Sequence, residues 1–230
     1  WTARRAYRLI VPSQYLKTVV ERWGVPPERI EVVINAIEPL KAVVHREELR
    51  QSLGVSGKTV ILCVGRAVPW KGVGELISLW KRVPKSHLLV VAGEGPELEN
   101  WKRLADVESV SERVRFLGRT DRVVTVRWFN AADACALNSG YEGWSHVVAE
   151  AISLGVPCLV SDKGGNPETR AMYGELVKVL PYKDETVWVE ALSKVNPLVE
   201  ARAGVASWGF EDMKRSALEV LKETSGERQA

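Results

Sequence analysis

The chain has 230 residues, of which 46% are hydrophobic and 27% charged, the composition of a packed globular protein. Its formal net charge of +3 is small, and basic and acidic residues are interspersed, which argues against a nucleic-acid partner. No apolar run approaches the ~18 residues that a membrane-spanning helix needs.

The N-terminal part predicts a strand, a helix and a second strand. Residues 8–11 are a short apolar run. A helical segment follows, with Ser13 as its N-cap and Gly24 as its stop. Residues 29–35 then predict the second strand. These elements form one β-α-β unit.

Residues 36–57 do not continue this alternation of strands and helices. They contain a turn signal and one short amphipathic helix, at 45–53. From residue 58 onwards, strands and helices alternate regularly. The predicted strands span residues 59–65, 86–93, 113–118, 134–138, 157–161 and 175–180. The predicted helices span residues 73–83, 97–107, 125–132, 146–155, 167–174, 185–195 and 211–223, before a frayed polar tail at 224–230.

The predicted strands are uninterrupted apolar runs, which a sheet covered by helices on both faces requires. Alternation of such strands with helices predicts the α/β class with a doubly wound, Rossmann-like parallel sheet. In such sheets ligands bind beyond the carboxyl ends of the strands. The loops that follow the strands are therefore the candidate functional segments.

The loop of residues 64–75 carries two cations, Arg66 and Lys71, just before a helix. Two cations beside a helix N-terminus favour an anion site, although two exposed basic residues would look the same. The loop is not a Walker A motif, because Trp70 precedes Lys71 and Gly72 follows it.

The loops of residues 90–99 and 116–121 give weaker signals. The first approaches a dinucleotide fingerprint, but Leu98 stands where the third glycine belongs, and a tight turn before a helix explains the glycines equally well. Backbone groups of the second loop could contact the edge of a flat ring.

The stretch from residue 137 to 165 holds two carboxylates eight residues apart. Glu142 lies before a helix whose predicted N-cap is Ser145, and Glu150 lies inside that apolar helix. A carboxylate buried without donors is costly, so Glu150 needs ligand hydroxyls, a backbone donor or an arginine. In the next loop, Asn166 is a candidate cap, and Glu168 suits the positive end of the following helix.

The remaining reactive side chains favour structural roles. The three cysteines, Cys63, Cys135 and Cys158, lie in apolar runs without a CxxC pattern, which predicts buried reduced thiols in a cytosolic protein. His45 and His87 are predicted at the surface. His146 lies beside the first acid, at the start of the predicted helix.

Taken in order, these loops resemble the nucleotide-sugar lobe of the retaining GT-B glycosyltransferases of family 4, also called glycosyl transferases group 1. The resemblance covers most of residues 7–215. The matching motifs are Gly65-Arg66 with Lys71-Gly72, the GEGP turn at 93–96, Phe116 to Gly118, the acid pair Glu142 and Glu150, and the loop Gly164-Gly165-Asn166-Pro167-Glu168. Departures at Asn138-Ser139 and Trp144-Ser145-His146 alter the donor-sugar pocket.

The resemblance implies catalytic roles for Arg66, Lys71 and Glu142. The two cations would stabilise the departing nucleoside diphosphate, Glu142 would hold the sugar, and Glu150 would accept hydrogen bonds from the ribose. The residues that it assigns to nucleotide-sugar binding are Gly65, Arg66, Lys71, Glu94, Leu117, Gly118, Arg119, Glu142, Gly143, Trp144, Ser145, His146, Val147 and Glu150. It implies no cofactor and no metal.

The resemblance also implies a division of the chain and a set of partners. Residues 1–37 would be the end of an otherwise missing acceptor lobe, 38–57 an interlobe linker, 58–205 the nucleotide-sugar domain, and 206–230 a C-terminal helix and frayed tail. We expect the chain to bind a nucleotide-diphosphate sugar weakly and to transfer nothing alone. For the full-length enzyme we expect a cytoplasmic location, with peripheral membrane association left open.

Two further function classes stay open on this fold: a non-catalytic nucleotide-binding or assembly module, and a nucleotide-sugar epimerase. All four residues Arg66, Lys71, Glu142 and Glu150 are present, which favours a transferase over the module. A module that no longer binds a donor would be expected to lose some of these residues. An epimerase would need further acid and base residues that the sequence does not reveal. The failed dinucleotide fingerprint disfavours a nicotinamide oxidoreductase.

Overall fold

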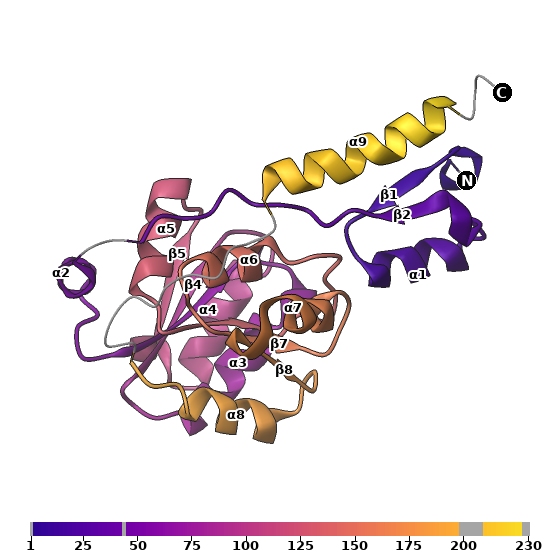
Figure 1. The fold of residues 1–230 in the computed structure, drawn as a ribbon. Coiled ribbons are helices and arrows are strands. Elements are labelled where there is room, and N and C mark those ends of the chain that lie inside the picture. The colour runs from indigo at the N-terminus through magenta and orange to yellow at the C-terminus, as the bar shows by residue number, and fades with distance from the viewer. Residues whose placement is uncertain (1, 43–44, 198–208, 227–230) are drawn as a thin grey trace.

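The computed structural model describes residues 2–42, 45–197 and 209–226 and contains two parallel sheets with helices around them (Figure 1). The strands are β1 (Leu9–Val11), β2 (Ile30–Val32), β3 (Thr59–Val64), β4 (His87–Ala92), β5 (Val114–Gly118), β6 (Ala134–Leu137), β7 (Cys158–Ser161) and β8 (Val177–Leu180). The α-helices are α1 (Gln14–Arg22), α2 (Arg46–Ser52), α3 (Val73–Leu79), α4 (Leu98–Val107), α5 (Arg122–Ala131), α6 (His146–Ser153), α7 (Asn166–Tyr173), α8 (Glu185–Ser193) and α9 (Phe210–Gly226).

The large sheet has six parallel strands in the order β5-β4-β3-β6-β7-β8. The chain starts this sheet at β3, winds outwards to β5, and then returns to β6 on the other side of β3. This reversal is the topological switch point, at which doubly wound sheets bind their ligands. The predicted α/β class with a parallel, Rossmann-like sheet is confirmed.

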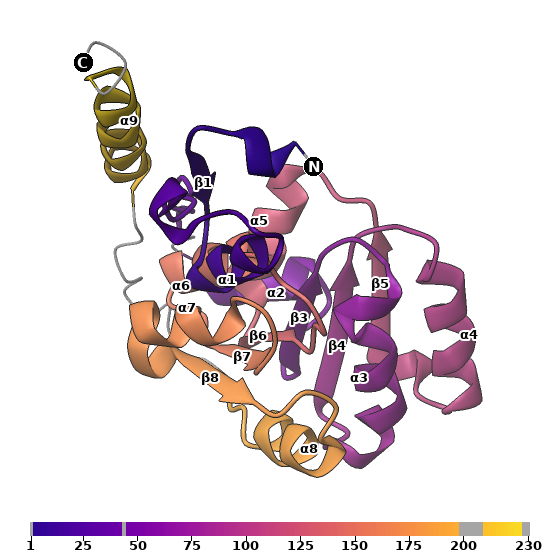
Figure 2. The ribbon, with the colours of Figure 1, turned by 90° about the vertical axis from the view of Figure 1, so that its right-hand side faces the viewer.

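Helices cover both faces of this sheet (Figure 2). On one face α3, the 3-10 turn that follows it, α4 and α8 contribute the large buried side chains Leu76, Trp80, Trp101 and Trp188. On the other face α5, α6 and α7 pack on the strands, with Phe129 at the centre of that core. Because both faces are covered, all six residues of β4 are buried, and this explains the continuous apolar run in the sequence.

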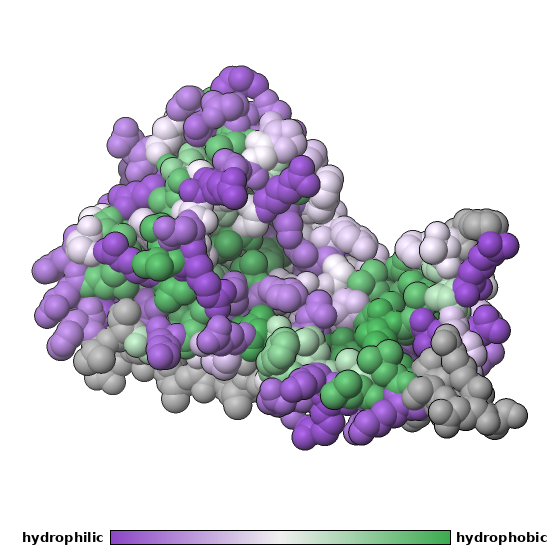
Figure 3. Space-filling view, turned by 90° about the horizontal axis from the view of Figure 1, so that it is seen from above, coloured by the Kyte–Doolittle hydropathy of each residue, from purple (hydrophilic) through white to green (hydrophobic). Residues whose placement is uncertain are grey.

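The N-terminal unit consists of β1, α1 and β2 and has a small core of its own. The predicted cap is confirmed, since the Ser13 hydroxyl accepts a hydrogen bond from the Leu16 amide at 3.1 Å. The helix α9 contacts this region through Met213, whose sulfur lies 3.4 Å from the Ala36 amide nitrogen. Apolar side chains gather over these elements (Figure 3). The exposed large ones are Tyr7, Ile10, Trp23, Phe210, Leu218 and Leu221.

Several predicted helix ends were wrong, and two of them have a clear local reason. The helix α5 begins at Arg122 and not at residue 125, because Asp121 caps it by accepting from the Val124 amide at 2.8 Å. The N-cap of α7 is Gly165 and not Asn166, whose side-chain amide instead donates to the buried Ser161 hydroxyl at 3.0 Å. The last helix, predicted to end at residue 223, continues to residue 226.

The histidine prediction was half right. His45 is exposed, but His87 is buried, and this burial lowers the pKa of its imidazole. The three cysteines are free and buried, as predicted, and burial raises the pKa of Cys63 to about 12. Such thiols are poor nucleophiles at neutral pH. Among the described helices, none has the length and apolarity to cross a membrane.

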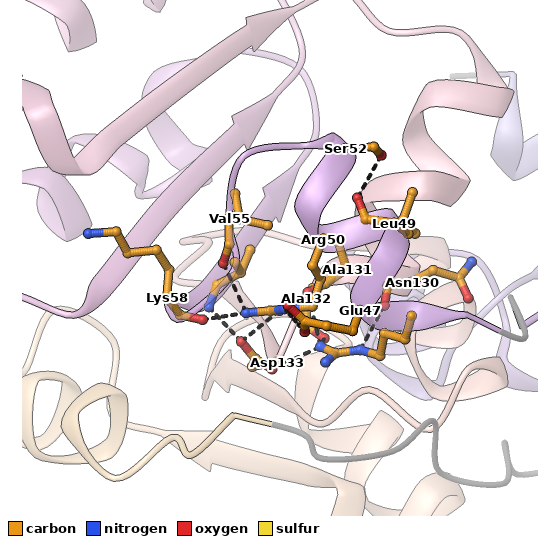
Figure 4. A network of polar contacts seen from close by, with 12 residues as sticks. Glu47, Leu49, Arg50, Ser52, Val55, Lys58, Asn130, Ala131, Ala132 and Asp133 are labelled. Atoms are coloured by element: carbon orange, nitrogen blue, oxygen red, sulfur yellow. Dashed lines mark hydrogen bonds and ion pairs between the residues drawn. The ribbon is translucent and has the colours of Figure 1, made fainter.

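The helix α2 is fixed to the large sheet by a buried polar network (Figure 4). Arg46 and Arg50 donate to backbone carbonyls at the C-terminal end of α5, which have no partners within that helix. Both guanidinium groups also contact the carboxylate of Asp133, at 2.8 and 3.2 Å. This network attaches the helical part of the predicted linker to the start of β6.

Candidate functional site

The candidate site lies where the loops after β3 and β6 meet, at the switch point of the sheet. The Gly140 amide donates to the Trp70 carbonyl at 2.7 Å and joins the two loops. Gly72 has a φ of +68°, and a Cβ there would lie 1.7 Å from the Asn138 carbonyl oxygen. Only glycine fits this close approach, so the sequence Lys71-Gly72 is required to bring the cation against the second loop.

Lys71 and Glu142 form an ion pair across these two loops. The Lys71 Nζ lies 2.6 Å from the Glu142 Oε1, and the two side chains are 22% and 11% exposed. A charge-assisted hydrogen bond in such a partly desolvated place is strong and fixes both groups. The structure therefore brings two of the three predicted catalytic residues into direct contact.

Arg66 lies beside this pair on the open side of the same loop, and its side chain is exposed. Beneath Arg66 and Lys71 is an enclosed space of about 10 Å³, which is enough for about one water molecule. Ser139 lines that space, and its buried hydroxyl has no hydrogen-bond partner among the described residues.

The helix α6 directs its N-terminus toward this loop. The predicted cap is confirmed, because Ser145 accepts a hydrogen bond from the Val148 amide at 3.4 Å. The amides of His146 and Val147 belong to the first turn, where no helical carbonyl can accept from them, and this end of the helix attracts anions. Trp144 is buried beside the cap, with an indole N–H that is unpartnered in the described part of the chain.

Glu150 has an arginine partner that the sequence prediction named only as a type. The Arg122 guanidinium lies 3.4 Å from the Glu150 Oε1, but that arginine is 59% exposed, whereas the glutamate side chain is only 20% exposed. Burial raises the pKa of Glu150, and the nearby charges of Arg122 and His146 only partly oppose this effect. The carboxylate is therefore incompletely compensated and can accept further hydrogen bonds.

Four more of the predicted residues lie at or just beyond the ends of β4 and β5: Glu94, Leu117, Gly118 and Arg119. Leu117 and Gly118 end β5, and the Gly93 amide donates to the Gly118 carbonyl at 2.8 Å. Arg119 and Glu94 face each other at 3.8 Å, and both are exposed. These four predicted residues are joined to the cationic loop through the backbone, since the Ala67 amide donates to the Glu94 carbonyl at 2.8 Å.

His146, Ser139 and Arg122 complete the surroundings. The His146 Nε2 lies 3.3 Å from the side-chain nitrogen of Asn35, so this histidine faces the segment that follows β2. Ser139 was named in the sequence only as part of a departure that alters the donor-sugar pocket, without a contact of its own. Arg122 was missed, because it is an ordinary first-turn arginine. No cluster of three or more potential metal ligands occurs within the described ranges.

A family model described as "Glycosyl transferases group 1" matches residues 45–196 of the chain. An uncharacterized glycosyltransferase of Methanocaldococcus jannaschii is 26% identical over 214 residues, which cover 89% of this chain and 52% of the relative. The D-inositol 3-phosphate glycosyltransferase of a Mycobacterium species is 31% identical over 209 residues, 87% of this chain and 48% of the relative. The chain thus spans about half the length of these relatives.

Solved structures share the fold. HepE of Anabaena in complex with UDP-glucose superposes with a TM-score of 0.81 at 21% identity, over 97% of this chain and 65% of that one. TarM of S. aureus, in a complex that contains UDP, gives a TM-score of 0.80 at 15% identity, over 95% and 44%. At these identities the likeness extends to the fold.

Proposed function

The chain belongs to the glycosyl transferases group 1 family, and from that premise we propose that it is the donor-binding lobe of a retaining GT-B glycosyltransferase of family 4. The full-length enzyme would transfer a sugar from a nucleotide-diphosphate sugar to an acceptor. The observation that carries the proposal is the pairing of Lys71 with Glu142, beside Arg66 and the N-terminus of α6, at the switch point of the sheet.

The proposed chemistry follows from where charge develops. When the bond between sugar and diphosphate breaks, negative charge grows on the leaving phosphate oxygen. Fixed cations at that position stabilise the transition state more than the ground state, which lowers the barrier. Arg66 and Lys71 would supply this charge without a metal, so we expect transfer by the full-length enzyme to be unaffected by EDTA.

The remaining residues would hold the donor along the edge of the sheet. Glu150 would accept hydrogen bonds from the ribose, since its carboxylate is paired in the described part of the chain with an exposed arginine at 3.4 Å. Glu142 would hold the sugar, and residues 117–119 would border the base. A relative named for its donor, a GDP-mannose-dependent mannosyltransferase of Mycolicibacterium smegmatis, supports a nucleotide-sugar donor.

We also propose that residues 2–36 belong to an acceptor lobe that is completed by chain outside this sequence. The N-terminal unit has a sheet of only two strands, and such a pair is marginally stable on its own. The exposed apolar side chains over this unit and α9 would then be covered by the rest of that lobe (Figure 3).

A thermal-shift panel of nucleoside diphosphates and nucleotide sugars tests donor binding on this chain. We expect at least one of them to raise the melting temperature, because a ligand that binds only the folded state stabilises it. The shift should disappear in Arg66→Ala and become clearly smaller in Glu150→Gln. Arg103→Ala and Glu99→Gln, on the exposed face of α4, are the matched controls and should keep the shift. An equal response to all nucleotides in every variant would refute the site.

The binding of nucleotide should also depend on pH through Glu150. Its pKa is raised above the ordinary 4.5, and the ribose hydroxyls donate best to the ionised carboxylate. Affinity should therefore fall as the pH is lowered through this raised pKa, beginning above pH 4.5. Titration calorimetry of wild type and Glu150→Gln checks this, because ionisation of the ligand's phosphate affects both proteins equally. Parallel pH profiles would contradict the assignment.

A further inference from the structure

Glu168, on α7 beside the large sheet, caps the helix α1 of the N-terminal unit. Its two carboxylate oxygens accept hydrogen bonds from the backbone amides of Gln14 and Tyr15, at 2.9 and 2.8 Å. These amides form the first turn of α1, whose positive end favours a carboxylate. Glu168 lies in the first turn of its own helix, α7, as the sequence suggested. Its carboxylate nevertheless caps α1, which lies more than 150 residues earlier in the chain.

The same turn of α1 holds the loop that carries Glu142. The Ser13 hydroxyl, which is fully buried, donates to the Gly143 carbonyl at 2.6 Å. Tyr15 packs edge-on against Tyr141, with ring centroids 5.9 Å apart. The N-terminal unit thus contacts the residues on both sides of Glu142.

The opposite side of this loop is held from the start of α7. The Gly165 amide donates to the Glu142 carbonyl at 2.7 Å. Gly164 has a φ of +64°, and a Cβ there would lie 2.2 Å from the same carbonyl oxygen, so the two loops are in direct backbone contact. The carbonyls of two consecutive residues, Glu142 and Gly143, are therefore held from two different units, and Glu168 joins those two units to each other.

We propose that Glu168 is a positioning residue for the sugar end of the donor site and acts through α1 and Gly143. This inference rests on the proposed function, because the loop is taken to bind the sugar of the donor. The carboxylate fixes α1, α1 fixes the Gly143 carbonyl through Ser13, and the fixed loop keeps Glu142 against Lys71. If the loop is already ordered before the donor binds, less binding free energy is lost in ordering it.

Two variants break this connection without touching the donor site. In Glu168→Gln one carboxylate oxygen becomes an NH₂ group, which cannot accept from the α1 amides. Gln14→Pro removes one of the two donating amides, and proline is tolerated at this first helical position. Ser13 already has the extended backbone that precedes proline, with φ −157° and ψ 157°. The matched control is Gln14→Ala, which keeps the amide and removes only the side chain.

Titration calorimetry with UMP, UDP, UDP-glucose, GMP, GDP and GDP-mannose on the whole chain tests the proposal. In Glu168→Gln the affinity for the nucleotide sugar should fall about tenfold, with a smaller fall in Gln14→Pro and none in Gln14→Ala. Affinity for the nucleoside monophosphate should stay within about twofold, since the ribose end is untouched; a general loss of stability would weaken both alike.

The outcomes separate the two proposals. If the wild-type chain binds one of these nucleotide sugars and both variants bind it with unchanged affinity, the role of Glu168 is refuted while the proposed function stands. If both variants lose monophosphate and nucleotide-sugar affinity equally, Glu168 is a structural residue only. If wild type binds none of the six ligands, the donor site fails and the positioning role fails with it.

Discussion

Replacing Lys71 with methionine is expected to lower kcat of the full-length enzyme by about 100- to 1000-fold. Methionine keeps the length and apolar stem of the side chain and removes only the charge. The proposed leaving diphosphate then loses a fixed cation at the point where its charge develops. The lost charge destabilises the transition state more than it destabilises the enzyme–donor complex. For this reason kcat should fall more than donor affinity does. Steady-state kinetics with the donor found in the binding panel provide the measurement.

The control for this change is Lys81→Met. Lys81 pairs with Glu108 at 2.7 Å on an exposed part of the large unit, and its loss should leave kcat unaltered. The loss of Lys71 also leaves Glu142 without its ion-pair partner in a place where that side chain is only 11% exposed. A melting curve of each variant therefore accompanies the kinetics. If the Lys71→Met enzyme is folded and has the kcat of wild type, the proposed catalytic role of Lys71 is refuted.

Much of the fold was predictable because its signals are local. Continuous apolar strands alternating with helices specify a parallel sheet covered on both faces, and the hydroxyls of Ser13 and Ser145 mark the helix starts that the structure confirms. Asp121 was an equally local signal that the sequence analysis missed. The ends of elements depend on single capping contacts, so they are the least certain part of such predictions.

The contacts of the candidate site could not be derived from spacing. Lys71 and Glu142 are 71 residues apart, and they meet only because β3 and β6 are neighbours in the sheet. An arginine was one of three partners considered for Glu150, and nothing in the local sequence distinguishes Arg122 from the other arginines. The carboxylate of Glu168 shows the same limit, since its position on α7 says nothing about a helix that belongs to the other unit.

Asp133 is the residue on which the stability of the large unit depends most directly. Its side chain is fully buried, and its carboxylate accepts from Arg46 at 2.8 Å, from Arg50 at 3.2 Å and from the Val60 amide at 2.7 Å (Figure 4). Arg50 is itself only 3% exposed and, besides Asp133, pairs with Glu47 at 3.7 Å and donates to backbone carbonyls. The carboxylate thus joins α2, the first strand of the sheet and the loop before β6.

Replacing Asp133 with asparagine should lower the free energy of unfolding by about 3–5 kcal/mol, because breaking a buried ion pair leaves an uncompensated buried charge. The amide keeps the shape of the side chain, so the loss reports charge and hydrogen bonding and not a cavity. Urea unfolding measures the change, with Glu99→Gln as an exposed acid-to-amide control expected to cost less than about 1 kcal/mol. Equal losses in the two variants would mean that solvent, Glu47 or the backbone carbonyls already compensate the two arginines, and that the Asp133 carboxylate adds little to the attachment of α2.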